Sequence, residues 1–128
     1  LPEEPILKEH REFMRYGILR KLRLASIRKQ TFGGHFSIHK KDIESVNGYD
    51  ENYVGWGGED QDIAMRLVLA GFRGTSVIKN ARILHLWHPK DMGDKHWREG
   101  GNTEYFLRKK ISAYCDNGLK KLKATPNH

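Results

Sequence analysis

Two adjacent carboxylates, Glu59 and Asp60, directly follow a glycine-rich loop, residues 55–58, and begin a segment with helical periodicity. Free backbone N–H groups and the helix dipole favour a carboxylate or a bound phosphate at the start of a helix. Because adjacent side chains diverge on a turn, one carboxylate can hold a hydroxyl group while the other accepts its proton, which is general-base catalysis. The same pair also fits a purely structural role, since acidic residues are common in a first helical turn.

Trp56 is the one large side chain of the glycine-rich loop and lies between Gly55 and Gly57. Few neighbours in sequence can pack against it, and aromatic faces stack well on the apolar side of sugar rings. Trp56 is therefore a candidate carbohydrate-binding residue, with an ordinary core tryptophan as the alternative.

Histidines supply the candidate metal ligands. His85 and His88 are three residues apart near the end of a predicted strand, so both imidazoles reach one metal only if the backbone turns there. In a straight strand they would face opposite sides, and packing with hydrogen bonding is the more frequent role of such a pair. His35 follows a glycine pair and is a candidate pocket residue, whereas His39 and His96 are weaker candidates.

Alternating short helices and strands must position these residues, and this order is typical of an α/β domain. The pattern predicts helices at 40–46 and 59–70, which end at Asn47-Gly48 and Gly71. Strands are predicted at 31–38, 75–79 and 81–87. Two basic segments complete the prediction: one or two helical turns within 5–29, interrupted at Gly17, and an amphipathic helix from Thr103 to Leu122.

The composition predicts one soluble domain over residues 1–128. No segment approaches the ~20 apolar residues of a spanning helix, and the first residues do not resemble a signal peptide. Cys115 is the only cysteine, which excludes an internal disulfide and a cysteine-based zinc site. We therefore expect a cytoplasmic location.

The net charge of +7 favours anionic partners, and much of the excess lies in residues 8–29 and 108–123. Solvated faces of terminal helices are the simplest interpretation. An alternative function is a basic module that binds nucleic acid or an anionic membrane, but the chain lacks the aromatic and basic interleaving of single-strand binders, so no nucleic acid is expected. Peripheral contact of the basic helices with the inner face of a membrane stays open, as does a metal-dependent hydrolase that uses both histidines and the acidic pair.

Several motifs in a fixed order resemble one known family. They are Phe32-Gly33-Gly34, then Asn47-Gly48-Tyr49-Asp50, then Gly55-Trp56-Gly57-Gly58-Glu59-Asp60-Gln61-Asp62 with Arg66-Leu67. Together they resemble the C-terminal, acceptor-side half of GT-A-fold glycosyltransferases, especially the beta-1,4-galactosyltransferase family and bacterial family 2 enzymes. The resemblance covers residues ~31–90 and implies a partial GT-A-like fold, with a short mixed sheet flanked by helices.

The resemblance also implies a role for each matching residue. Asp60 would be the catalytic base for the acceptor hydroxyl, and Glu59 would orient the acceptor sugar. Trp56, Gly57 and Gly58, together with Gly34 and His35, would bind substrate. The implied reaction is an inverting transfer of galactose or an N-acetylhexosamine from a UDP-sugar to a carbohydrate acceptor, which can be lipid-linked.

Two further expectations follow from the resemblance. His85 and His88 correspond to a methionine and a histidine that bind manganese in the galactosyltransferase pattern, so Mn²⁺ or Mg²⁺ is the expected cofactor. A complete enzyme of this fold also has a nucleotide-binding half with an Asp-x-Asp motif, and no such half precedes Leu1. We therefore expect this chain to be a partial enzyme that acts with a nucleotide-binding half.

Overall fold

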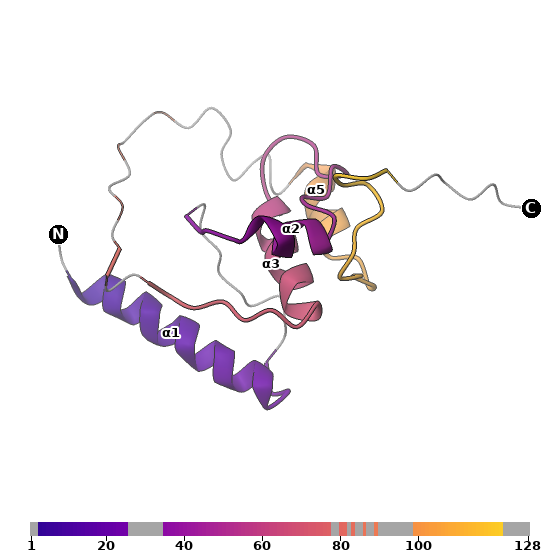
Figure 1. Ribbon diagram of the computed structural model, residues 1–128. Helices are drawn as coiled ribbons and strands as arrows, with labels where there is room; N and C mark the ends of the chain where they lie inside the picture. The colour runs from indigo at the N-terminus through magenta and orange to yellow at the C-terminus, as the bar shows by residue number, and fades with distance from the viewer. Residues whose placement is uncertain are drawn as a thin grey trace, which may run out of the picture.

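The computed structural model describes residues 3–25, 35–77, 80, 81, 83, 86, 89 and 99–121. Its helices are α1 (Glu3–Lys21), α2 (Lys40–Ser45), α3 (Glu59–Leu69) and α5 (Gly101–Phe106). Helices α2, α3 and α5 lie together, α1 lies along one side of them, and the segment after α3 runs back alongside α1 (Figure 1). None of the helices in the described ranges is long and apolar enough to cross a membrane.

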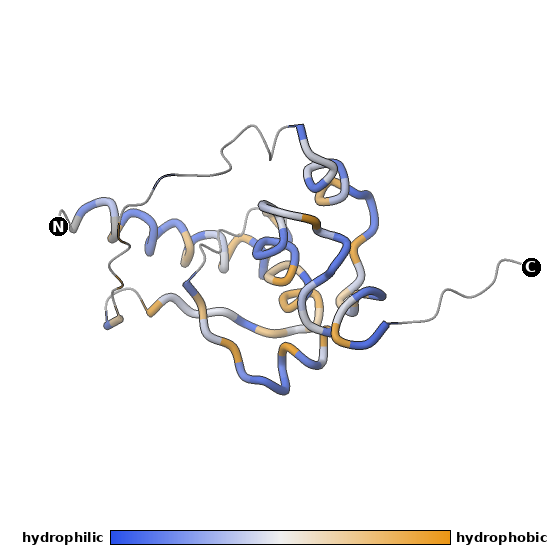
Figure 2. The backbone as a smooth tube through the Cα atoms, turned by 90° about the horizontal axis from the view of Figure 1, so that it is seen from above, coloured by the Kyte–Doolittle hydropathy of each residue, from blue (hydrophilic) through white to orange (hydrophobic). Residues whose placement is uncertain are grey.

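Helix α3 is the centre of the structure because it contributes side chains to two hydrophobic clusters. Ile63 and Leu67 pack with Val46 in the first cluster, which covers α2. Met65 packs with Tyr53 and Phe106 in the second, which joins α3 to α5. Hydrophobic residues gather at α3, whereas α1 is mainly hydrophilic (Figure 2). The start of α3, which carries the two candidate carboxylates, is thus fixed from both sides.

The predicted end of α2 is confirmed. Asn47 and Gly48 both have positive φ angles, 67° and 74°. Their N–H groups donate to the carbonyls of Glu44 and Ile43 at 3.0 and 2.8 Å, so the last turn of the helix is closed by hydrogen bonds. The predicted helix over 59–70 is likewise confirmed as α3, with Gly71 at a φ of 92° directly after it.

Asn47 also holds the C-terminal part of the described chain. Its Nδ2 donates to the carbonyls of Cys115 and Lys120 at 2.7 and 2.8 Å, and its Oδ1 accepts from the Lys120 N–H at 2.8 Å. Its backbone carbonyl accepts from the Leu119 N–H at 2.8 Å. One buried asparagine therefore positions a segment that is about seventy residues away in sequence.

A substitution at Gly118 tests the contact between Asn47 and the C-terminal segment. A Cβ atom at position 118 would lie 1.9 Å from the Asn47 carbonyl oxygen, so Gly118→Ala must push the two segments apart. We expect it to lower the free energy of unfolding by about 1–3 kcal/mol in urea denaturation. Gly17→Ala in α1 is the matched control, because no atom lies within 4 Å of its new Cβ, and it should stabilise by up to about 1 kcal/mol. Equal effects of the two variants would contradict the contact.

The helix predicted within residues 5–29 is longer than expected. Instead of one or two turns interrupted at Gly17, α1 is continuous from Glu3 to Lys21. Glycine in a helix interior costs only about 1 kcal/mol relative to alanine, and most residues around it are good helix formers. The charged residues of this segment therefore lie along one continuous helix.

The predicted helix from Thr103 to Leu122 was also wrong, since α5 ends at Phe106. Residues 107–121 are irregular, apart from an isolated antiparallel bridge between Asn117 and Lys121. Asp116, Asn117 and Gly118 are strong turn formers, and the hydrogen bonds to Asn47 replace those that a helix would supply. Tertiary contacts outweighed the amphipathic pattern here.

The predicted sheet is not seen in the described residues. The predicted strands have described parts at 35–38 and 75–77, which are irregular rather than paired. The remaining parts of the three predicted strands lie largely outside the described residues. The structure therefore shows the helical part of the predicted α/β domain, and the sheet stays a prediction.

Candidate functional site

The glycine-rich loop has a backbone that only glycine adopts readily at three positions. Gly55, Gly57 and Gly58 have φ angles of 77°, 106° and 94°. A side chain at any of these positions would strain the left-handed conformation. The loop thereby turns sharply into α3 and leaves the Trp56 side chain half exposed, at 50%.

Asn102 on α5 clamps this loop from the other side. Its Oδ1 accepts from the Val54 N–H at 3.1 Å. Its Nδ2 donates to the carbonyls of Val54 and Trp56 at 3.1 and 3.3 Å. The Asn102 side chain is buried, with 5% exposed, whereas its bonds to the loop are partly buried. The exposed indole of Trp56 therefore rests on a backbone that is fixed at both ends.

Asn102→Ala should loosen the loop without removing any residue from it. We expect more efficient acrylamide quenching of Trp56 fluorescence and a loss of about 1–3 kcal/mol in stability, because the Val54 polar groups lose their partner. The measurement needs a Trp87→Phe, Trp97→Phe background, in which Trp56 is the only indole. Asn117→Ala is the control, since that side chain makes an exposed bond to Asn52. Unchanged quenching in the folded Asn102 variant would contradict the clamp.

Asp60 and Glu59 form the first turn of α3, where the helix has no side-chain cap. The Tyr49 hydroxyl donates a hydrogen bond to Asp60 Oδ1 at 3.0 Å. Burial raises the pKa of Tyr49 to about 12, and the bond to Asp60 and the nearby negative charges add to the effect. Tyr49 therefore stays protonated at neutral pH and remains a hydrogen-bond donor that orients the Asp60 carboxylate.

Glu59 has a buried oxygen without a protein donor. Among the described atoms, its Oε2 is buried and no hydrogen-bond partner lies within reach. A buried acceptor that lacks a donor is costly, so a native structure that retains one commonly uses it to bind a ligand or water. Glu59 Oε2 is thus a buried acceptor beside Asp60 whose hydrogen-bonding capacity the described protein atoms leave unused.

Asp62, the third acid of this turn, has a structural role instead. It is fully buried and accepts a hydrogen bond from Arg66 Nε at 2.7 Å on Oδ2. Arg66 is also buried and donates to the carbonyls of Val46 and Gly48 at 2.8 and 2.7 Å. The pair therefore ties α3 to the end of α2.

Arg108 completes this buried ion network, which comprises Asp62, Arg66 and Arg108. Its guanidinium donates to Asp62 Oδ1 at 2.7 Å and to the Tyr53 hydroxyl at 3.1 Å. It also lies 4.2 Å from the centre of the Tyr105 ring, a cation–π contact. Both Asp62 oxygens are thus occupied by the protein, so the Asp60-Gln61-Asp62 triplet does not offer two free carboxylates to a metal.

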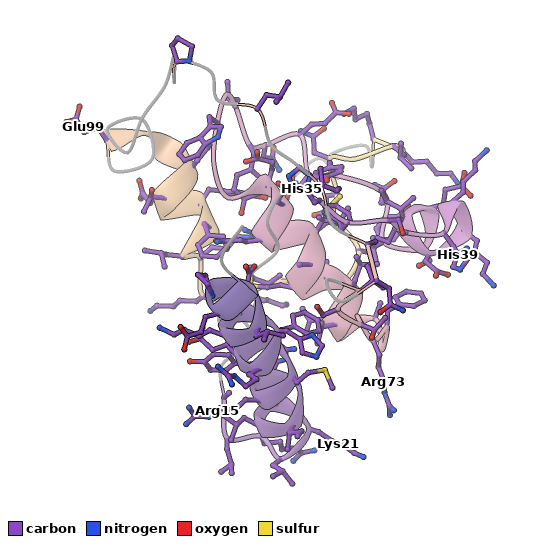
Figure 3. All side chains as sticks on the ribbon, turned by 90° about the vertical axis from the view of Figure 1, so that its left-hand side faces the viewer. Arg15, Lys21, His35, His39, Arg73 and Glu99 are labelled. Carbon is purple, nitrogen blue, oxygen red and sulfur yellow. The ribbon has the colours of Figure 1, made fainter. Side chains whose placement is uncertain are left out.

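Some predicted site residues lie outside the described part of the chain. Gly34, His85 and His88 are among them, so neither the glycine pair nor the metal site is tested. The described residues contain no group of three or more side chains suited to a metal ion. His35 is exposed in the segment that leads into α2, and Figure 3 shows it apart from His39, which lies at the edge of the molecule.

Sequence patterns did not identify Tyr49, Asn102 and Arg108 as residues that organise the site. Arg108 was interpreted as part of a solvated basic face, but its side chain is mostly buried against Asp62, at 21% exposure. The only readable signal was the spacing of Asp62 and Arg66, four residues apart in one helix. The partners of Asn102, and the Asp62 and Tyr53 partners of Arg108, lie 46 or more residues away, so no local pattern reveals them.

Comparison with known proteins gives the family. A family model described as the N-terminal domain of galactosyltransferase matches residues 15–89, more than half of the chain. Beta-1,4-galactosyltransferase 1 from Homo sapiens is 40% identical over 65 residues, which are 48% of this chain and 16% of that protein. Beta-1,4-galactosyltransferase 3 from Homo sapiens is 31% identical over 93 residues, 73% of this chain and 23% of that protein. No solved structure matched the chain.

The family model and these relatives identify a galactosyltransferase-like glycosyltransferase domain. The chain belongs to the galactosyltransferase family. It spans less than a quarter of the length of these curated relatives. The matching model is described as an N-terminal domain, whereas the motifs predicted a C-terminal half, so the position of this segment within an enzyme stays a prediction.

Proposed function

We propose that this chain forms the acceptor-side catalytic segment of an inverting glycosyltransferase. The donor is a UDP-sugar of the galactose or N-acetylhexosamine type, and the acceptor is a carbohydrate hydroxyl. The observation that carries the proposal is the arrangement at the start of α3, where Tyr49 holds Asp60 and the adjacent Glu59 has a buried oxygen without a donor. Family membership supports the same reaction class.

In the proposed reaction, Glu59 accepts a hydrogen bond from the acceptor sugar and orients it. Asp60 then takes the proton of the attacking hydroxyl as that oxygen bonds to the anomeric carbon of the donor. The bond between the anomeric carbon and the diphosphate oxygen breaks, and UDP leaves. The exposed Trp56 side chain, whose backbone carbonyl accepts a hydrogen bond from Asn102, covers the sugars by stacking.

The nucleotide-binding half and a divalent metal are part of this proposal. His85 and His88 would hold Mn²⁺ or Mg²⁺, which neutralises charge on the departing diphosphate. If so, treating the complete enzyme with a chelator should abolish transfer, and adding Mn²⁺ should restore it. Full activity in the presence of the chelator would contradict the metal requirement.

The direct experiment is a transfer assay on the complete enzyme that carries this segment. UDP-hexoses and UDP-N-acetylhexosamines are supplied with and without saccharide acceptors, and UDP release is measured. We expect release that depends on an acceptor. Release that proceeds equally without an acceptor would indicate a hydrolase, and failure to release UDP with any donor would also contradict the proposal.

A further inference from the structure

A groove lies between α1 and the wall formed by the end of α3 and the segment that follows it. It has a volume of about 420 Å³. Phe13 and Ile18 of α1 line it from one side, and Val68 and Phe72 from the other. Arg20, Lys21 and Arg73 are at the same groove. Figure 3 shows Lys21 and Arg73 projecting at the same end of the molecule, although they come from different elements.

An apolar stripe on α1 continues from this groove. The large side chains at helical spacing on this face are exposed: Leu7 at 37%, Met14 at 48% and Ile18 at 60%. Leu22, just beyond the helix, continues the stripe at 59%. Residues 7, 14, 18 and 22 fall within one narrow arc of a helix, so these side chains form one surface rather than isolated exposures.

The charges beside the groove have one sign, whereas the N-terminal half of α1 also carries the acidic residues Glu3, Glu4, Glu9 and Glu12. From residue 13 to residue 24 the chain carries Arg15, Arg20, Lys21 and Arg23 and no acidic residue. Arg73 adds a further positive charge from the opposite wall of the groove. No ion pair of Arg20, Lys21 or Arg73 occurs among the residues that the structure describes. These cations are available to an external anion.

We propose that this basic groove, defined by Phe13, Ile18, Phe72, Arg20, Lys21 and Arg73, docks on the surface of an anionic lipid bilayer. A helix with apolar residues on one face and Lys or Arg beside them lies in the interface between headgroups and acyl chains. The cations attract anionic headgroups, and the apolar stripe and groove take the adjoining acyl region. A nucleic-acid backbone would satisfy the charges but leave the apolar stripe in water.

Vesicle co-sedimentation tests this docking without any enzymatic assay. The complete enzyme that carries this segment is mixed with vesicles of phosphatidylcholine alone, or of phosphatidylcholine and phosphatidylserine in equal parts. We expect binding to the second kind only, weakening as salt is added. Each cation removed should weaken binding about fivefold, so the triple variant Arg20→Gln, Lys21→Gln, Arg73→Gln should lose on the order of 100-fold.

Two further variants make the test specific to the groove. Lys109→Gln, Lys110→Gln, Lys120→Gln removes the same charge from exposed positions outside the groove, and it should bind almost as well as the original chain. Ile18→Ser should weaken binding at unchanged charge, because it removes an exposed apolar side chain from the stripe.

Equal binding to both kinds of vesicle would overturn the proposal. So would equal losses in the two triple variants, which would indicate a general charge effect. If the groove variants still bound vesicles but no longer bound another protein that the original enzyme binds, the surface would belong to a protein partner instead. None of these experiments measures sugar transfer, so their results do not depend on the proposed reaction.

Discussion

Asp60→Asn in the complete enzyme should lower kcat for sugar transfer by roughly 10²–10⁴-fold, the usual contribution of a positioned general base. The amide cannot take the proton of the acceptor hydroxyl. It is nearly the same size as the carboxylate, and its oxygen can still accept the hydrogen bond from Tyr49. The site should therefore keep its shape, and the loss should fall on the chemical step rather than on donor binding.

The effects on kcat and on the Michaelis constant distinguish a catalytic base from a structural residue at position 60. The Michaelis constant for the UDP-sugar should change little in the Asp60 variant, while kcat falls. Asp116→Asn serves as control because Asp116 is an exposed carboxylate outside the site, and its kinetics should match those of the original enzyme. Transfer at a near-normal kcat in the Asp60 variant would refute the assignment of the base.

Arg66→Met should have the largest effect on stability, a loss of about 3–5 kcal/mol in the free energy of unfolding. The guanidinium is 1% exposed and bonds to Asp62 and to the carbonyls of Val46 and Gly48. Methionine fills much of the volume but leaves these groups without their donor. The cost arises from uncompensated burial of polar groups rather than from a cavity.

An exposed ion pair provides the control for the Arg66 prediction. Lys40 and Glu44 are also four residues apart on a helix, but at 3.8 Å and largely in solvent. Lys40→Met should therefore change stability by less than about 0.5 kcal/mol. Urea denaturation of both variants measures the two losses in the free energy of unfolding. A loss in Arg66→Met as small as that in Lys40→Met would contradict the role of the buried ion network.

Helices that are bounded by turn-forming residues were predictable from the sequence. Asn47-Gly48 and Gly71 end α2 and α3 as predicted, because residues that tolerate a positive φ stop a helix through local geometry. The same local reasoning located Glu59 and Asp60 at a helix start. It also explains why the loop contains glycine at positions 55, 57 and 58.

Long-range contacts account for what the sequence did not predict. The segment after Phe106 has an amphipathic pattern but is held by Asn47, so its backbone hydrogen bonds go elsewhere. Asn102 and Arg108 act on residues that only the fold brings close. A buried asparagine or arginine in sequence is indistinguishable from an exposed one until its partners are known.

The anomeric configuration of the product reports whether transfer at the start of α3 inverts the donor sugar. The complete enzyme is given an α-linked UDP-sugar and a saccharide acceptor, and the new linkage is identified by proton NMR. We expect a β-linked product, because in the proposed reaction the acceptor oxygen activated by Asp60 attacks the face opposite the leaving diphosphate. An α-linked product would contradict it.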